Sequence, residues 1–550
     1  MLRSLSIACA FLVVACSDHR EGAHEPTAPQ IDSPEVRAGE RLFLDGRFAQ
    51  FFAENSGGNL NAPLLVGDPV LETITLGGVQ QPSPFAGGTM HCAVCHNVDQ
   101  VLAIPGGGMR SYADFAVGSP TPLRPDGSTM TVRNTPPLVN ASIPREAPGI
   151  FHFDGEFATI EKLVSSTITG RNYGWLISER DAAQTHVAAV IRQDDGMGSL
   201  ASGFGGIPYS TLLDSATTGL PIKYALPSQF TLNMSTATDA DIVNAVAELI
   251  ATFVRSLEFE RDSGNRYSGS PYDVFLALNS LPRAPEPGEA SLDYARRLRA
   301  LLGGVTDPEF VDQGPFEFHS QNFVFGPLEL HGLRTYLRES PSAPVGGVGN
   351  CMACHPPPDF TDFGFHNAGF TQEEYDSVHG FGTFRFISVP DLATRDADPE
   401  AYLPASASYP SGHGPFRVRL DPLNATVADL GLWNIFANDS YRSAQSAILT
   451  HLDLTYGNGT QTLGEAILLP LTESLFKTPG LRDLGHSEPY GHAGNFTSLD
   501  AVVTHYMHFG TFAAQGFVRN GDPRLNTIQL VVADVGPIVA FLRSLNEDFE

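Results

Sequence analysis

Two short motifs place cysteine and histidine side chains at the same spacing. Each has two cysteines separated by two residues and followed at once by a histidine: Cys92, Cys95 and His96 in the first, and Cys351, Cys354 and His355 in the second. Two thiols one helical turn apart can each form a thioether bond to a haem vinyl group, and the adjacent imidazole then lies under the iron. The motifs therefore predict two covalently bound haem c groups, with His96 and His355 as iron ligands.

The same four cysteines allow other arrangements. Two C-x-x-C pairs can hold one tetrahedral zinc ion through four thiolates, and cysteines of an exported protein can pair as disulfides. Neither arrangement needs a histidine directly after each pair, whereas both pairs here are followed by one. The sequence therefore favours haem attachment, and the long separation of the motifs indicates that each organises its own domain.

Charge and composition limit the partners and the fold class. The 550 residues include 33 Lys and Arg against 61 Asp and Glu, which gives a formal net charge of −28. Such acidity excludes nucleic acid as a natural partner and favours basic partners at low salt. With 54 glycines, 41 prolines and only weak, scattered strand signals, the sequence predicts a mostly α-helical fold with long loops.

The first residues resemble an export signal. Arg3 precedes the apolar run Leu5–Ala15, which is too short to span a bilayer, and Cys16 stands where a bacterial lipobox has its acylated cysteine. We expect a signal peptide at residues 1–15 and a flexible, lipid-anchored tether at 16–34. The protein would then be periplasmic and touch the outer membrane only through its lipid. The alternative is ordinary signal-peptidase cleavage nearby.

Hydrophobic periodicity predicts three helices. Apolar residues recur at helical spacing in Glu35–Phe52, Thr159–Ser166 and Asp241–Leu257. For the last of these, core packing is a sufficient explanation of the apolar face.

Further motifs occur in the order seen in one family of bacterial haem proteins. They are EVRAGERLFLD from Glu35, the first haem motif, RNTPPLVNASI from Arg133, FDG from Phe153, CMACHPPPDFTDFGFHNAGF from Cys351, and the block KTPGLR, EPYGHAG and TSL from Lys477. These motifs resemble those of the di-haem cytochrome c peroxidase and MauG superfamily over residues 35–545.

The resemblance implies two cytochrome c-like haem domains with long loops and insertions. An N-terminal, catalytic domain would span residues 35–260 with an insertion at about 181–230. A C-terminal, electron-transfer domain would span residues 261–550 with an insertion at about 391–446. By this resemblance peroxide reacts at the N-terminal haem, and the C-terminal haem relays electrons to it.

A calcium ion between the two domains is also implied by the resemblance. Its ligands would be the Asn134 side chain and the backbone oxygens of Ser487 and Pro489. Oxygen ligands suit this hard cation. The alternative is that Asn134 only caps a turn.

The N-terminal haem departs from the family in its distal ligand. Peroxidases of this family close the resting haem with a histidine from the loop before the R-N-x-P motif, but no histidine occurs between His96 and His152. Unless Met109 or Met130 binds the iron, we expect this haem to be five-coordinate and open.

The C-terminal haem departs in the corresponding ligand. The family's distal methionine stands seven residues after the leucine of the T-x-L motif, and counting from Leu499 reaches Tyr506. Tyrosine there is the pattern of MauG, a di-haem enzyme that oxidises residues of a partner protein, and an anionic oxygen ligand stabilises ferric iron. The alternatives are Met507, about 100° further round a helix, and the flanking His505 and His508.

The family's proton-transfer residues are missing as well. Counted from the FDG motif, its distal Gln, Pro and Glu positions fall on Leu163, Thr167 and Tyr173. The missing Glu is the general acid and base that moves a proton across peroxide. Residues that could replace it are His152, Glu156, Arg171 and Tyr173.

The tryptophan that usually bridges the two haems is also absent. Phe153 stands in its place and is a far poorer relay, while Trp175 and Trp433 are the only tryptophans of the chain.

Several functions fit these observations. The first is a haem peroxidase-type oxidoreductase that reduces hydrogen peroxide with electrons from a small cytochrome or another donor. The second is a MauG-like enzyme that oxidises a protein or a small aromatic substrate. The others are a di-haem oxygenase that uses dioxygen and a plain electron-transfer cytochrome. The open N-terminal haem and the length of the chain argue against the plain carrier.

The optical spectrum of the ferric protein distinguishes an enzyme from a carrier. We expect one high-spin haem, because the N-terminal iron lacks a distal protein ligand, together with one low-spin haem. Two low-spin haems would instead favour the plain electron carrier.

Overall fold

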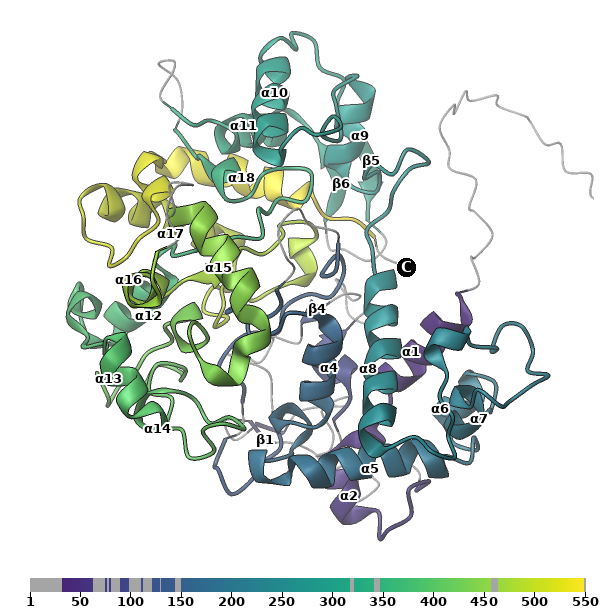
Figure 1. The fold of residues 1–550 in the computed structure, drawn as a ribbon. Helices are drawn as coiled ribbons and strands as arrows, with labels where there is room; N and C mark the ends of the chain where they lie inside the picture. Colours follow the sequence, from purple (N-terminus) through teal and green to yellow (C-terminus); the bar gives the residue numbers. More distant parts are fainter. Residues whose placement is uncertain are drawn as a thin grey trace, which may run out of the picture. The chain divides into compact units, whose positions relative to one another are not determined.

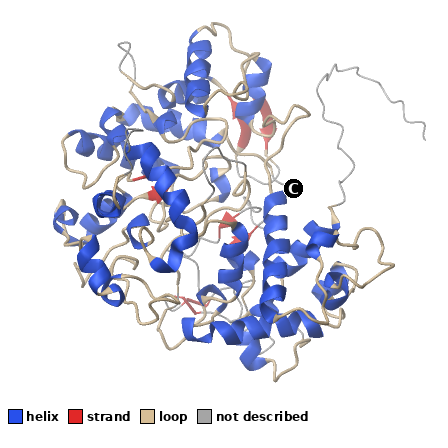
Figure 2. Cartoon of the chain, in the orientation of Figure 1, coloured by secondary structure: helices blue, strands red, loops and turns tan. Residues whose placement is uncertain are grey.

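Helices and the loops between them make up most of the chain that the structure describes (Figure 2). The structure is a computed structural model, and it describes residues 32–62, 75–76, 79–80, 90–97, 110–111, 121–128, 130–143, 150–316, 321–340, 347–456 and 463–548. The predicted mostly α-helical fold is confirmed. The predicted signal peptide, Cys16 and Met109 lie outside the described residues.

One long helix organises the first half of the chain. The helices there are α1 (Pro34–Phe43), α2 (Gln50–Asn55), α3 (Cys92–Cys95), α4 (Ile160–Ile168), α5 (Arg180–Gln193), α6 (Ser199–Gly203), α7 (Tyr209–Leu213) and α8 (Asp239–Ser256). Thr238 and Asp241 form a capping box that starts α8. Because α1, α4 and α5 all contact α8 (Figure 1), its apolar side chains form the centre of this half.

The second half contains shorter helices, and two of them pack against a third. Its helices are α9 (Pro271–Leu278), α10 (Ser291–Gly303), α11 (Pro327–Tyr336), α12 (Phe370–His379), α13 (Leu392–Ala397), α14 (Pro399–Tyr402), α15 (Arg442–Tyr456), α16 (Glu465–Leu468), α17 (Leu499–Ala514) and α18 (Val532–Arg543). α18 contacts both α11 and α17. This places α17, which carries Tyr506, against the packed core.

Strands among the described residues are short and paired in antiparallel hairpins or bridges. The pairs are β1 (Thr75–Leu76) with β2 (Val79–Gln80), β3 (His96–Asn97) with β4 (Arg110–Ser111), β5 (Val311–Pro315) with β6 (Asn322–Phe325), and β7 (Phe365–His366) with β8 (Phe476–Lys477). The last pair matters most for the site, because it joins the segment after the second haem motif to the KTPG segment.

The buried apolar side chains of the described residues form three clusters. The first draws on residues from Ala38 to Tyr267, and the second on residues from Tyr272 to Leu545. The third combines Ile150 with residues from Phe365 to Leu475 and includes much of the predicted insertion at 391–446. Pro34–Glu550 nevertheless forms one contact unit, and the domain boundary at residue 260 stays a prediction.

The predicted helix at Glu35–Phe52 is two helices. α1 ends at Phe43, and a 3-10 turn at Gly46–Phe48 precedes α2. Asp45 caps this turn by accepting a hydrogen bond from the Arg47 N–H at 3.0 Å. Such a local side-chain cap competes with continuation of the helix, which explains the break.

The other two predicted helices are close to the observed ones. Thr159–Ser166 corresponds to α4, which Thr159 caps through its hydroxyl, and Asp241–Leu257 corresponds to α8. The predicted insertion at 181–230 includes most of α5, whose Ala183 and Val187 are fully buried in the first cluster. In the described part of the chain, no helix has both the length and the apolar character needed to cross a bilayer.

The close packing of α11 on α18 depends on one glycine. A Cβ atom at Gly332 would overlap the carbonyl oxygen of Pro537, whereas a Cβ at Gly536 on the facing helix would meet nothing within 4 Å. We expect Gly332→Ala to lower the free energy of unfolding by about 1–3 kcal/mol, as overpacking does. Gly536→Ala should be neutral or stabilise by up to roughly 1 kcal/mol through helix propensity. Denaturant unfolding of both variants tests this, and equal effects would contradict the packing.

Candidate haem sites

The first haem motif lines a cavity of about 220 Å³, here called the N-terminal cavity. Cys92 and Cys95 lie one turn apart on α3, and His96 follows at the start of β3. Residues of α4, α8 and the segments 136–143 and 477–482 complete the wall. Burial lowers the pKa of His96 to about 4, so its ring is neutral, as an iron ligand must be.

The second haem motif lines another cavity of about 240 Å³, the C-terminal cavity. The His355 Nδ1–H donates a hydrogen bond to the Phe360 carbonyl oxygen at 3.0 Å. This bond fixes the tautomer and leaves Nε2 able to bind a metal. Burial lowers the pKa of His355, so this imidazole is neutral too.

The two cavities fit haem better than zinc. Cys92 and Cys95 line one cavity, while Cys351 and Cys354 line the other. A single zinc ion with four thiolates would need both pairs in one place. In the part of the chain that the structure describes, none of these four cysteines forms a disulfide. The arrangement suits one haem in each cavity, held by the cysteines and by His96 or His355.

One wall separates the cavities. Phe153, Pro136, Pro137 and the segment Lys477–Gly480 line both of them. The Lys477 N–H donates to the Phe153 carbonyl oxygen at 2.7 Å, which ties this wall together. Phe153, which has the sequence position of the family's bridging tryptophan, thus lies in the wall between the two cavities.

The two tryptophans lie elsewhere. The indole N–H of Trp175 donates to the Phe48 carbonyl oxygen at 3.0 Å, and Trp433 is buried in the third apolar cluster. Neither is among the described residues that line the two cavities.

The three positions that replace the family's proton-transfer residues all face the N-terminal cavity. Leu163 and Thr167 on α4, together with Tyr173, contribute to its lining. The Tyr173 hydroxyl lies 3.1 Å from Cys92 Sγ, and burial raises its pKa well above the usual value. Tyr173 is therefore a neutral hydroxyl beside the attachment point, and none of the three supplies a carboxylate.

His152 and Glu156 are brought together, with His152 in the cavity lining. His152 Nδ1 lies 3.0 Å from Glu156 Oε2, and the His152 side chain is 31% exposed. Glu156 also binds Arg417, and Asp154 pairs with Arg133 and Arg417. His152, Asp154 and Glu156 are spaced closely enough to hold a metal ion, but the two guanidinium groups already compensate the carboxylates.

Arg171 and Met130 contact residues away from the N-terminal cavity. Arg171 binds the Asp126 carboxylate at 2.6 Å and the carbonyl oxygens of Pro122 and Ser128, which secures the loop at 121–128. Met130 Sδ lies 3.3 Å from Arg419 Nη1. Neither residue is among the described lining of the N-terminal cavity.

Of the four candidate distal ligands at the C-terminal haem, Tyr506 alone is in the described lining of the C-terminal cavity. Met507 packs against the second apolar cluster, and His508 is exposed. His505 is engaged by Glu373 and by the Ala368 carbonyl oxygen at 2.8 Å. In the absence of iron, burial raises the pKa of Tyr506 above its usual value.

The predicted calcium ligands lie at the C-terminal cavity, although they are far apart in the sequence. Asn134 Nδ2 donates to the Pro489 carbonyl oxygen at 2.6 Å, and both residues, with Ser487, contribute to the cavity lining. The Asn134 N–H also donates to the His492 carbonyl oxygen at 2.7 Å. A cation would need the amide reversed so that Oδ1 faces Pro489, and the calcium site stays a prediction.

Two histidines at the cavities were not anticipated from the sequence. His91 lines the N-terminal cavity, and burial lowers its pKa to about 4. Its position directly before Cys92 was the one available signal. His366 lines the C-terminal cavity, and no sequence pattern links it to its partner Asp522.

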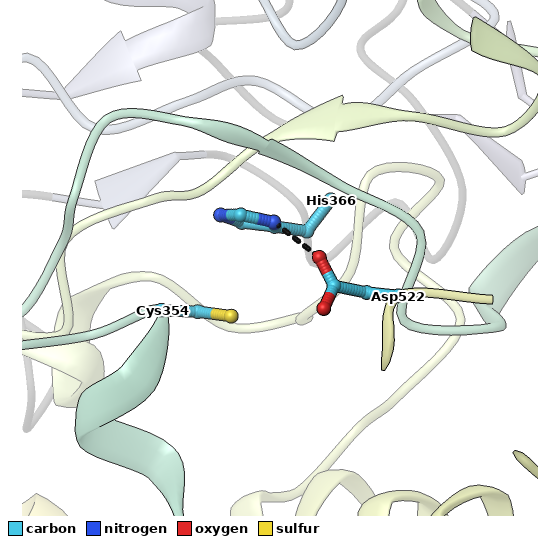
Figure 3. A group of neighbouring side chains, drawn as sticks. All are labelled: Cys354, His366 and Asp522. Carbon is cyan, nitrogen blue, oxygen red and sulfur yellow. Dashed lines mark hydrogen bonds and ion pairs between the residues drawn. The ribbon is translucent and has the colours of Figure 1, made fainter. Parts of the chain in front are cut away.

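His366 is held between two carboxylates. Its Nδ1 lies 2.6 Å from Asp522 (Figure 3). Its Nε2 lies 2.8 Å from Asp362. Although burial opposes it, Cys354 and these carboxylates raise the pKa of His366 well above its usual value. Cys354, His366 and Asp522 are close enough to hold a metal ion, but a thioether bond from Cys354 to haem would remove the thiolate from this set.

No family model and no curated protein matches the chain, but solved structures do. One is the di-haem peroxidase BthA from Burkholderia thailandensis E264, with 17% identity over 94% of this chain and 87% of that chain and a TM-score of 0.45. A variant of BthA matches with the same identity and coverage and a TM-score of 0.43. A MauG-like protein associated with microbial copper homeostasis shares 15% identity over 94% of this chain and 91% of that chain, with a TM-score of 0.41.

The position of Tyr506 generates a test of the C-terminal ligand. We expect Tyr506→Phe to change the low-spin spectrum of the ferric protein, because it removes the oxygen ligand. The neighbouring substitution Met507→Leu should leave that spectrum unchanged. The reverse result would show that the ligand position is one residue further along α17.

Proposed function

We propose that the chain is an exported, di-haem c-type oxidoreductase of the cytochrome c peroxidase and MauG type. It would reduce hydrogen peroxide at the N-terminal haem, with electrons relayed through the C-terminal haem. The observation that carries this proposal is the pair of cavities, each with one C-x-x-C-H motif and both against one wall. A plain carrier would share that wall but would not need the pair of His152 and Glu156 beside one cavity.

Bound haem iron would supply the electron exchange and the coordination position at which peroxide reacts. The chain's own residues would do the rest. His96 and His355 would bind the two irons, and the mainly apolar linings would exclude water. Phe153 and the KTPG segment would keep the haems close enough for direct electron transfer without a tryptophan.

Proton transfer falls to His152 in this proposal. Reduction of hydrogen peroxide to two water molecules takes two electrons from the donor and two protons. With Nδ1 engaged by Glu156, His152 Nε2 can accept the peroxide proton and return it to the departing oxygen as the O–O bond breaks. Tyr173 is a neutral hydroxyl whose pKa lies well above the usual value, so it suits the role of base less well.

The source of the electrons distinguishes two versions of this function. A small, basic electron-donor protein suits the net charge of −28. A protein or aromatic substrate, as in the MauG-like version, is favoured by the presence of Tyr506 in the C-terminal cavity. Dioxygen in place of peroxide is favoured only by the apolar face at Leu163. Export, and an outer-membrane lipid on Cys16, belong to the proposal on the sequence pattern alone.

Removal of the N-terminal iron ligand tests the assignment of the reacting haem. In His96→Ala we expect loss of turnover with peroxide and loss of the spectral change that stoichiometric peroxide produces without a donor. The C-terminal haem spectrum should persist, whereas His355→Ala should lose that spectrum instead. Full turnover in His96→Ala would mean that peroxide reacts at the other haem. If the unaltered protein does not respond to peroxide, the dioxygen version gains support.

A further inference from the structure

Arg417 belongs to the predicted insertion at 391–446, yet its side chain reaches the turn that carries His152. Its Nη2 lies 2.6 Å from Glu156 Oε2 and 3.1 Å from Asp154 Oδ2. The Arg417 side chain is 18% exposed, and that of Glu156 is 13% exposed. The ion pair is therefore largely shielded from water. Salt screens such a shielded pair only weakly.

Glu156 joins Arg417 to His152 through a single oxygen atom. The Oε2 atom that accepts from Arg417 is the one that faces His152 Nδ1 at 3.0 Å. Burial acts to raise the pKa of Glu156, but Arg417 and His152 bring it well below its usual value. An ionised carboxylate can only accept hydrogen bonds, so His152 Nδ1 must carry the proton. Nε2 then keeps its lone pair in the neutral ring.

The backbone conformation at His152 is also constrained by its neighbours. His152 has a φ of +66°, in the left-handed region that residues other than glycine seldom adopt. Phe151 and Phe157 pair across this turn, and the Phe157 ring lies edge-on to the imidazole at 4.9 Å between centroids. The surroundings thus select one backbone conformation and restrict the ring.

Other charged and titratable groups face this pair from several elements. Asp154 is fully buried between Arg417 and Arg133. Tyr441, which also comes from the insertion, interacts with Glu156 through its side chain, and His96 interacts electrostatically with His152. Arg417 is the group that binds both carboxylates of the HFDGE turn.

We propose that Arg417 is a positioning residue of the N-terminal site. Through Glu156, it holds His152 as the tautomer whose Nε2 takes a proton from a ligand that enters the N-terminal cavity. This rests on the proposed function, because it requires haem in that cavity. The insertion at 391–446 is then a part of the N-terminal site, although it belongs to the C-terminal half of the sequence.

A purely structural role would make Arg417 one of two ion-paired contacts between the insertion and the rest of the chain that the structure describes. The other contact offers a matched control. Arg133 Nε and Nη2 bind the Asp429 carboxylate at 2.6 Å and 2.7 Å, and that carboxylate also accepts from the Gly431 N–H. Asp429→Asn would therefore weaken the attachment of the insertion without removing a contact of Glu156.

Cyanide binding to the ferric, haem-loaded protein separates the two roles. At neutral pH cyanide arrives as HCN and must give up its proton before its carbon binds iron, so a nearby base accelerates association. We expect His152→Gln to slow cyanide association by about 100-fold, in the range of general-base effects. Arg417→Gln should slow it by about tenfold, as removal of an orienting partner does. Arg417→Lys should recover most of the rate.

Carbon monoxide binding to the reduced protein provides the internal control. Because this ligand carries no proton, its association rate should stay unchanged in all of these variants. Asp429→Asn should lower the melting temperature but leave both rates unchanged. A structural role of Arg417 would instead change the two rates together, and it would do so in Asp429→Asn too.

Each negative result would contradict a different part of the proposal. Protein without haem absorbance would contradict the proposed function itself. Unchanged cyanide association in His152→Gln would contradict its role as the base. Faster association in that variant would mean that His152 is an iron ligand, which also overturns the inference. Slower association in His152→Gln together with an unchanged rate in Arg417→Gln would overturn the role of Arg417 alone.

Discussion

One wall, formed by Phe153, Pro136, Pro137 and Lys477–Gly480, lines both cavities, and in the proposed function it would lie between the two bound haems. Its parts come from three distant segments of the chain. They are held by the β7–β8 pair and by the hydrogen bond from the Lys477 N–H to the Phe153 carbonyl oxygen. The apolar clusters, the packing of helices against α8 and α18 and the ion pairs of Arg133 all support this arrangement.

Each of the two cavities is lined by residues from both halves of the sequence. The N-terminal cavity takes Asp359, Lys477 and Arg482 from the second half of the chain, and Asn134 lines the C-terminal cavity. In the same way, Arg417 from the second half of the sequence contacts the charged turn beside His152. Each cavity is therefore completed by the other half of the chain, which couples the integrity of one haem site to the folding of the other.

The sequence predicted those features of the fold that depend on residues close together in the chain. The α4 and α8 helices follow from hydrophobic spacing, and side-chain hydrogen bonds within a few residues cap both of them. The motif order also predicted Phe153 at the wall and the approach of Asn134 to Pro489. The break after α1 was missed, because the periodicity of Glu35–Phe52 outweighed the Asp45 cap in the sequence pattern.

Contacts that depend on long-range packing could not be predicted. The pairing of His366 with Asp522 joins residues with no common motif, and the insertion gave no sign that Arg417 would reach Glu156. Tyr506 and Met507 could be ranked only by a count along the chain, whereas the rotation of α17 distinguishes them. Arg171, a candidate for catalysis, is instead engaged by the loop at 121–128.

The central claim is that porphyrin iron is covalently attached to the chain at two places. The most direct measurement combines the pyridine haemochrome spectrum of the denatured protein with the mass of the denatured chain. The account predicts that red pigment stays with the unfolded polypeptide, that its absorbance corresponds to two haems per chain, and that the mass rises by two haem groups. A colourless denatured chain of unmodified mass, or one that releases zinc instead, would contradict it.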